Sequence, residues 1–173
     1  MNIRLYNAYI INENFDADFG EIHISNGKID YIGNLGEKNK KWDRNIDMHN
    51  AVVMHGFSNC HTHSPMTLLR SYCDDQPLDI WLQNYIFPIE DRMTQEDCYY
   101  GTRLAVMEYL SCGTTSIADM YFHQESVIQA CIDSGLKVVG IGTAMDIDGQ
   151  TDEKIEYLEQ KYLKYNSYSP LCS

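Results

Sequence analysis

The chain has 173 residues, 44% of them hydrophobic, and a formal net charge of −12 at pH 7. A chain of this length can bury the core of one domain or slightly more. The acidic balance argues against nucleic-acid or anionic membrane partners, because both require a basic face. No apolar run reaches the roughly 18 to 20 residues of a membrane span, and the first residues lack a signal pattern. We therefore expect a cytoplasmic protein that acts on a small molecule.

The six cysteines are widely spaced, and none forms the Cys-x-x-Cys pair typical of zinc knuckles and redox sites. We expect reduced thiols, most of them buried as small apolar side chains. The one basic cluster, Lys38 to Lys41 with Arg44, is interleaved with asparagine and aspartate. It is expected to be a solvated loop.

The first fifty residues predict a small β-rich segment. Arg4–Ile11 is rich in β-forming residues, while Glu21–Ser25 and Lys28–Ile32 alternate polar and apolar side chains. Asn26-Gly27 separates these two runs, and Asn-Gly is the strongest short-range signal for a hairpin. We therefore assign residues 1–50 to a β-rich segment that contains a hairpin.

From residue 51 onward, strand patterns alternate with helical ones. Thr94–Ser111 has a threonine N-cap, acidic residues in its first turn and Gly113 just past its end, which are helix start and stop signals. Such alternation predicts parallel βαβ units, about three of them, over residues 51–173. The other expected elements are a strand over Ala51–His63, a short helix over Leu78–Tyr85, a strand over Thr114–Met120, a helix over Glu125–Ser134 closed by Gly135, a strand over Lys137–Gly142 and a helix that begins at Thr151.

The most informative motif is the pair His61 and His63 at the end of an apolar run. Alternate residues of a strand point to the same face, so the two imidazoles aim at one point. A catalytic zinc ion usually takes three protein ligands and leaves one position for water. The pair therefore predicts two ligands of a catalytic metal ion; the alternative is a chance pair on a solvated strand.

The sequence around this pair resembles a known family. The run from Met48 through His63 to Glu90, and the run Gly113–His123, closely resemble the amidohydrolase superfamily. The likeness is to its cytosine-deaminase-like branch, which holds the S-adenosylhomocysteine and methylthioadenosine deaminases and the triazine chlorohydrolases. The resemblance covers most of the chain.

The resemblance implies an α/β fold. The full architecture of the family is a (β/α)₈ TIM barrel with a small β-sandwich built from both ends of the chain. A complete barrel takes about 250 residues, so residues 51–173 correspond to its N-terminal portion and residues 1–50 to a segment of the sandwich.

The resemblance also implies a chemistry, that of a metal-dependent aminohydrolase or deaminase. One Zn²⁺ or Fe²⁺ ion, held by His61 and His63, would activate a hydroxide that attacks a ring carbon of a purine-like or other nitrogen heterocycle and releases ammonia. The remaining metal ligands and the catalytic proton shuttles are expected beyond Ser173. Displacement of chloride by the same hydroxide, as in the chlorohydrolases, is the alternative.

Two further residues are expected in the substrate pocket. Pro88-Ile89-Glu90 resembles the motif whose glutamate contacts a substrate hydroxyl in adenosine-type deaminases of the family, and Trp81 resembles the apolar pocket wall. The alternatives are a surface glutamate and a core aromatic. Many relatives carry an arginine in a Ser-Arg-Gly context where this chain has Ile141-Gly142-Thr143. The chain therefore lacks, at this position, a guanidinium that could contact the far end of a substrate.

The other candidates are expected to have structural roles. His123 follows a predicted strand and is expected at the pocket rim, while His23, His49 and His55 are expected to be structural. Asp119 lies inside a predicted buried strand, where its carboxylate must be hydrogen-bonded or neutral.

Two hypotheses of other classes remain open. The chain could be an inactive fragment, which would expose the unpaired edge of its third barrel strand and tend to form homo-oligomers. It could instead be one half of a split enzyme, completed by a C-terminal portion on another polypeptide. The fragment should bind zinc weakly, whereas an assembled enzyme should retain its metal ion.

Overall fold

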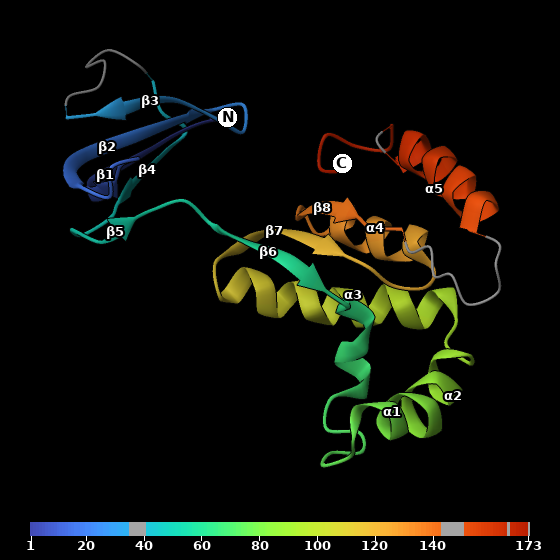
Figure 1. Cartoon of the computed structure of the whole chain (residues 1–173). Helices are drawn as coiled ribbons and strands as arrows, with labels where there is room; N and C mark the ends of the chain where they lie inside the picture. The colour runs from blue at the N-terminus through green and yellow to red at the C-terminus, as the bar shows by residue number, and fades with distance from the viewer. Residues whose placement is uncertain (35–40, 143–150, 166, 173) are drawn as a thin grey trace. The chain divides into compact units, whose positions relative to one another are not determined.

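The computed structural model describes residues 1–34, 41–142, 151–165 and 167–172. Most of the predicted basic loop, at residues 38–40, lies outside these ranges, as does Thr143. The chain divides into two compact units, Met1–His55 and Gly56–Ser173, and each is described by itself. The elements of both units are labelled in Figure 1.

The first unit is a five-stranded sheet. Its path runs β3-β2-β1-β4, with β5 also paired to β1. β1 is antiparallel to β2 and parallel to β4 and β5. Ala8, Ile10 and Ile22 form its buried core. The strands are β1 (Asn2–Ile11), β2 (Ala17–Ser25), β3 (Lys28–Gly33), β4 (Arg44–Asp47) and β5 (Val52–Val53).

The predicted hairpin is confirmed. β2 and β3 pair in antiparallel fashion around Asn26 and Gly27, whose φ angles are 52° and 78°. Positive φ at both central residues is the signature of the type I′ turn, which matches the twist of the flanking strands.

The strand predicted over Ala51–His63 is wrong as a single element. Val52 and Val53 pair with β1 in the first unit, whereas β6 (Phe57–Thr62) pairs with β7 in the second. One apolar run therefore serves two different sheets, a division that hydrophobicity alone does not reveal.

The second unit is built on a parallel sheet in the order β6-β7-β8, which confirms the predicted βαβ pattern. β7 (Thr114–Asp119) and β8 (Lys137–Gly140) each follow a helix. These are α3 (Gln95–Ser111), between β6 and β7, and α4 (Gln124–Asp133), between β7 and β8. One buried cluster joins Val106 of α3, Ile117 of β7, Ile128 of α4 and Val138 of β8, so the core lies between sheet and helices.

The predicted ends of α3 are confirmed. The Thr94 side chain accepts a hydrogen bond from the Asp97 amide, and Asp97 in turn accepts one from the Thr94 amide, so the two form a capping box. Gly113, past the C-terminal end, has φ of 79°. The last described helix is α5 (Thr151–Tyr165).

The short helix predicted over Leu78–Tyr85 is longer than expected. Helical structure runs from α1 (Leu78–Ile80) through a π-helical stretch (Trp81–Ile86) into α2 (Phe87–Glu90). Pro88 lies in the first turn of α2, directly after the π-helical stretch, and has no amide hydrogen to donate to the preceding turn. A 3₁₀ helix over Ser64–Leu69, which directly follows His63, was also not predicted.

The outer edge of β8, which the fragment hypothesis expects to be unpaired, carries one isolated bridge. The Val138 amide donates to the Leu171 carbonyl at 2.8 Å, and Val138 forms a parallel bridge with Cys172. The bridge is a single one, so most of this edge makes no named strand pairing among the described residues.

Six cysteines are free of disulfide bonds, as expected, although only Cys98, Cys131 and Cys172 are buried.

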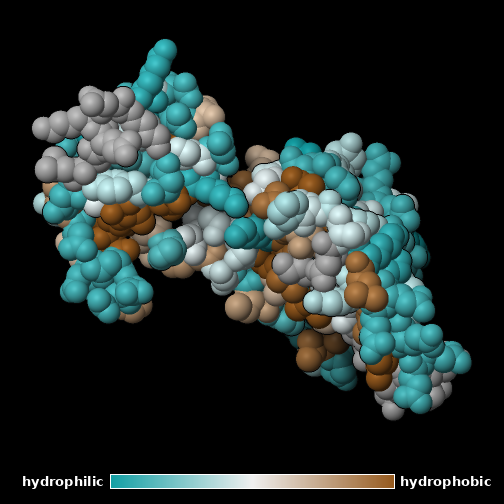
Figure 2. Space-filling view, turned by 90° about the horizontal axis from the view of Figure 1, so that it is seen from above, coloured by the Kyte–Doolittle hydropathy of each residue, from teal (hydrophilic) through white to brown (hydrophobic). Residues whose placement is uncertain are grey.

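Apolar side chains also reach the surface, as the brown atoms in Figure 2 show. On α3, Leu104 and Met107 are 42% and 69% exposed. Of the described helices, none has both the length and the apolarity that a membrane span requires.

Candidate functional site

The two histidines of the motif lie side by side where β6 ends. His61 is the second-last residue of β6, and His63 immediately follows the strand. Their ring centroids are 4.9 Å apart, with the ring planes at 87°. His61 is exposed and His63 is half-buried. The pair is thus brought together at the carboxyl end of a parallel strand, the edge at which α/β sheets carry their ligand sites.

A hydrogen bond sets the orientation of the His63 ring. Its Nδ1 atom donates to the carbonyl oxygen of Met120 at 2.5 Å. Because a carbonyl only accepts, Nδ1 carries the proton and Nε2 of the neutral ring keeps its lone pair. Metal-binding histidines in proteins are commonly held by such a bond from the second ring nitrogen. The residues present therefore fit a metal ion at this point.

A buried carboxylate lies beneath the pair. Asp119, at the end of β7, is fully buried, and its Oδ2 atom accepts a hydrogen bond from the Ser64 amide at 2.8 Å. Its Oδ1 atom has no partner among the described residues. Burial raises the pKa of Asp119, against the opposing effects of the Ser64 bond and of the two imidazoles. The expectation of a hydrogen-bonded carboxylate holds for one of its two oxygens.

In the part of the chain that the structure describes, no three histidine, cysteine or acidic side chains are placed to hold a metal ion together. The ring of His123 donates to the Met93 carbonyl at 3.1 Å and is exposed. His23 is buried in the first unit, 2.8 Å from Glu21, which gives it the structural role expected. His49 and His55 are exposed residues of that unit.

One cavity of about 800 Å³ brings three of the predicted site residues together. His63, Trp81 and Glu90 all line it, while His61 lies against the His63 ring. Most of the remaining wall is apolar or aromatic, as is typical of small-molecule sites. These wall residues are Met66, Leu78, Leu82, Ile86, Phe87, Met120, Tyr121, Phe122, Tyr157, Leu158 and Tyr165.

Tyr121 is a site residue that the sequence analysis did not single out. Its ring centroid lies 6.4 Å from that of His63, and its hydroxyl donates to the Met93 sulfur at 3.4 Å. Burial raises the pKa of the Tyr121 phenol, and the carboxylate of Glu90 raises it further. The available signal was its place two residues past Asp119, on the loop that leaves the carboxyl end of a barrel-type strand.

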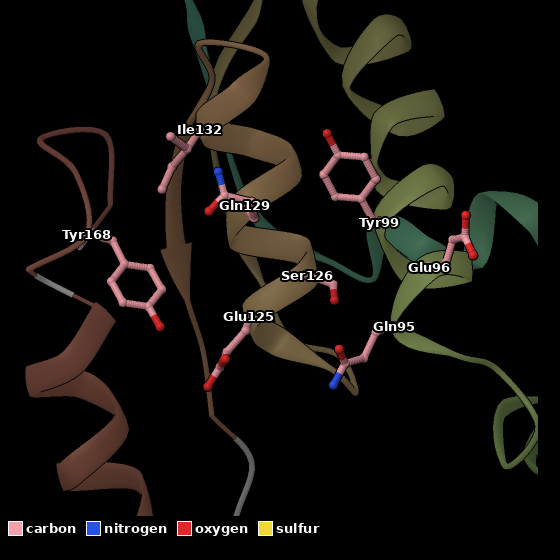
Figure 3. Close-up of a pocket in the computed structure, with 8 residues that line it drawn as sticks. All are labelled: Gln95, Glu96, Tyr99, Glu125, Ser126, Gln129, Ile132 and Tyr168. Carbon is pink, nitrogen blue, oxygen red and sulfur yellow. The ribbon is translucent and has the colours of Figure 1, made fainter.

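A second, open hollow of about 750 Å³ lies between α3 and α4 (Figure 3). Its residues are polar or aromatic except for Ile132, and Gln95, Glu125 and Ser126 also line the first cavity. The Glu125 carboxylate accepts from Lys161 and Lys164, each at 2.8 Å, so it joins α4 to α5. The lining comprises Gln95, Glu96, Tyr99, Glu125, Ser126, Gln129, Ile132 and Tyr168.

The family resemblance is confirmed by comparison with known proteins. The sequence profile described as the amidohydrolase family matches residues 52–167. The chain belongs to the amidohydrolase family. It is 44% identical over 120 residues to the 5-methylthioadenosine/S-adenosylhomocysteine deaminase of Moorella thermoacetica, an alignment that covers 68% of this chain and 28% of the relative.

Solved structures have the same fold. An adenosine deaminase from Xanthomonas campestris with bound zinc superposes with a TM-score of 0.80 at 27% identity, over 99% of this chain and 41% of that one. The zinc complex of atrazine chlorohydrolase from Arthrobacter aurescens TC1 gives a TM-score of 0.81 at 16% identity, over 98% and 45%. The second likeness shows the fold alone. The chain spans less than half the length of each of these three proteins.

Proposed function

We propose that this chain is the N-terminal portion of a zinc-dependent aminohydrolase that deaminates an adenosine-like nucleoside. In this proposal β6, β7 and β8 are the first strands of a (β/α)₈ barrel, and the first unit contributes to a β-sandwich. The parallel sheet supports the barrel assignment, as does the exposed apolar side of α3 around Met107, which further barrel elements would cover.

The observation that carries the proposal is the His61–His63 pair with its oriented ring. In the proposal these imidazoles hold one metal ion, Zn²⁺ or alternatively Fe²⁺. When bound there, the ion would lower the pKa of a water molecule and so provide a nucleophile at neutral pH. The other ligands and the proton shuttles would lie in the portion of the relatives that this chain does not span, on a C-terminal portion of the enzyme.

Trp81 and Glu90, which line the cavity together with His63, would bind the nucleoside. Trp81 is half-buried and presents an aromatic surface to the cavity, against which a purine ring can pack. Glu90 is a half-buried carboxylate on the same wall, and a carboxylate is a strong acceptor for sugar hydroxyls. Both roles accord with the names of the deaminase relatives.

Deamination is favoured over chloride displacement by the degree of relatedness. The 44% identical relative is named as a deaminase, whereas the likeness to the chlorohydrolase, at 16% identity, reaches only the fold. Release of ammonia from 5′-methylthioadenosine by the enzyme completed with its C-terminal portion would support the proposal. Release of chloride from atrazine, without ammonia release, would contradict it.

Nucleoside binding can be measured directly on the chain. A Trp42→Phe background leaves Trp81 as the sole tryptophan, because the chain has only two, and its fluorescence reports occupancy of the cavity. Titration with 5′-methylthioadenosine in the presence of zinc should give a saturable change. Glu90→Gln should weaken binding about tenfold, since a hydrogen bond to a charged group is lost. Glu96→Gln, at an exposed position, should not.

Two results would contradict this function. One is a linear, unsaturable fluorescence response to 5′-methylthioadenosine. The other is an unchanged affinity in the Glu90→Gln protein, which would remove Glu90 from the substrate site.

A further inference from the structure

The loop after β7 contacts both His63 and Met93. Its first residue, Met120, accepts the hydrogen bond from His63. The next residue, Tyr121, contacts Met93 through its hydroxyl. His123 reaches the same Met93 at its carbonyl oxygen. Met120 of this short loop thus holds His63, while Tyr121 and His123 of the same loop contact Met93.

Met93 is part of the turn that carries Glu90. The Met93 amide donates to the Glu90 carbonyl at 3.1 Å, directly after α2 ends. The loop therefore holds this turn at two points, a side-chain sulfur and a backbone carbonyl. Tyr121 and Glu90 also line the same cavity.

We propose that Tyr121 is a positioning residue, which fixes the distance between the Glu90 carboxylate and the His61–His63 pair. This inference rests on the function proposed above, in which Glu90 binds substrate hydroxyls. The preference for ligands that carry a ribose diol, over ligands that lack it, then depends on the contact between Tyr121 and the turn Glu90–Met93 as well as on Glu90.

The physical reason is the geometry that a rigid nucleoside demands. Its base and its diol are held at a fixed separation, so a carboxylate accepts from both hydroxyls only when its distance from the reacting end is fixed as well. Small displacements of binding groups weaken such interactions strongly. The phenol of Tyr121 is half-buried between the His63 ring and Met93, where it can set that distance.

The test compares two ligands that differ only in the diol. The affinities of the zinc-loaded full chain for adenosine and for 2′,3′-dideoxyadenosine are measured by Trp81 fluorescence in the Trp42→Phe background. The unsubstituted chain should prefer adenosine by roughly tenfold or more, as expected for hydrogen bonds to a carboxylate. In Tyr121→Phe the preference should fall below about threefold, while the affinity for the dideoxy compound changes by less than about twofold.

A second variant removes the other partner of the same contact. Met93→Leu removes the sulfur acceptor with little change in volume, and it should reduce the diol preference as Tyr121→Phe does. The matched control is Tyr99→Phe, whose hydroxyl donates to Asp133 on the surface, and which should keep the full preference.

The outcomes separate this inference from the function on which it rests. Equal loss of affinity for both ligands in Tyr121→Phe and Met93→Leu, with the diol preference kept, would show a purely structural role and overturn the inference alone. An unsubstituted chain that binds both ligands equally would overturn the role of Glu90 and this inference together. An unsubstituted chain that binds neither would overturn the proposed function itself.

Discussion

The Nδ1 atom of His63 lies 2.5 Å from the carbonyl oxygen of Met120. The two residues stand at the ends of neighbouring parallel strands, and the Met120 amide donates to the Thr62 carbonyl at 3.1 Å. The strand ends are therefore joined by a backbone bond and a side-chain bond. The side-chain bond leaves the lone pair of Nε2 in the neutral His63 ring available to a metal ion.

This bond predicts the tautomer of the neutral His63 ring. Long-range proton–nitrogen correlation spectra recorded where the ring is neutral should show the proton on Nδ1 and an unprotonated Nε2. The ring of His55 is exposed and makes no such bond to a carbonyl of the described residues, so it serves as the reference within the same spectrum. A proton found mainly on Nε2 of His63 would contradict the orientation described above.

The thiols should differ in reactivity because they differ in burial. Burial raises the pKa of Cys98 to about 11 and that of Cys131 to about 12, so neither forms much thiolate near neutral pH. Cys60 and Cys112 are exposed. A thiol-reactive reagent with mass-spectrometric mapping should label Cys60 and Cys112 first in the folded chain. Early labelling of Cys131 would mean that the core around α4 opens readily.

The contact between α4 and α5 should depend on pH. Hydrogen bonds from Lys161 and Lys164 lower the pKa of Glu125 below its ordinary value of 4.5. A carboxyl with a lowered folded-state pKa contributes stability above its unfolded pKa and loses that stability as the pH falls through the folded value. The contribution is therefore present at neutral pH and is lost in acid, as the pH falls through the lowered folded-state pKa of Glu125.

Glu125→Gln measures this contribution. Because Glu125 is exposed, its ion pairs are screened, and the loss should be about 0.5 kcal/mol in the free energy of unfolding at pH 7. The difference between variant and unsubstituted chain should vanish in acid and shrink in high salt. Glu96→Gln provides a control in the same region. A pH-independent difference would assign the effect of Glu125 to packing.

Local signals explain which elements were predictable. Asn26-Gly27 sets its own backbone angles, and the Thr94 capping box is complete within four residues. The proximity of His61 and His63 follows from strand geometry, since both residues lie at one strand end. In each case the determining contacts are close in sequence, so the pattern of a few residues is sufficient.

Contacts between distant residues explain what was not predictable. The run Ala51–His63 is split because Val52 pairs with β1 and not with β7. The polar strand Arg44–Asp47 likewise forms through its pairing with β1. The contact from Tyr121 to Met93 spans 28 positions of sequence. No local pattern encodes such pairings.

The central claim is that His61 and His63 together bind a metal ion, and zinc titration calorimetry on the chain tests it most directly. The account predicts that His61→Ala and His63→Ala each weaken zinc binding by more than about tenfold, because loss of a ligand should exceed the effect of losing an outer contact. His49→Ala, an exposed histidine of the first unit, should match the unsubstituted chain. Zinc affinity unchanged in both His61→Ala and His63→Ala would contradict the claim.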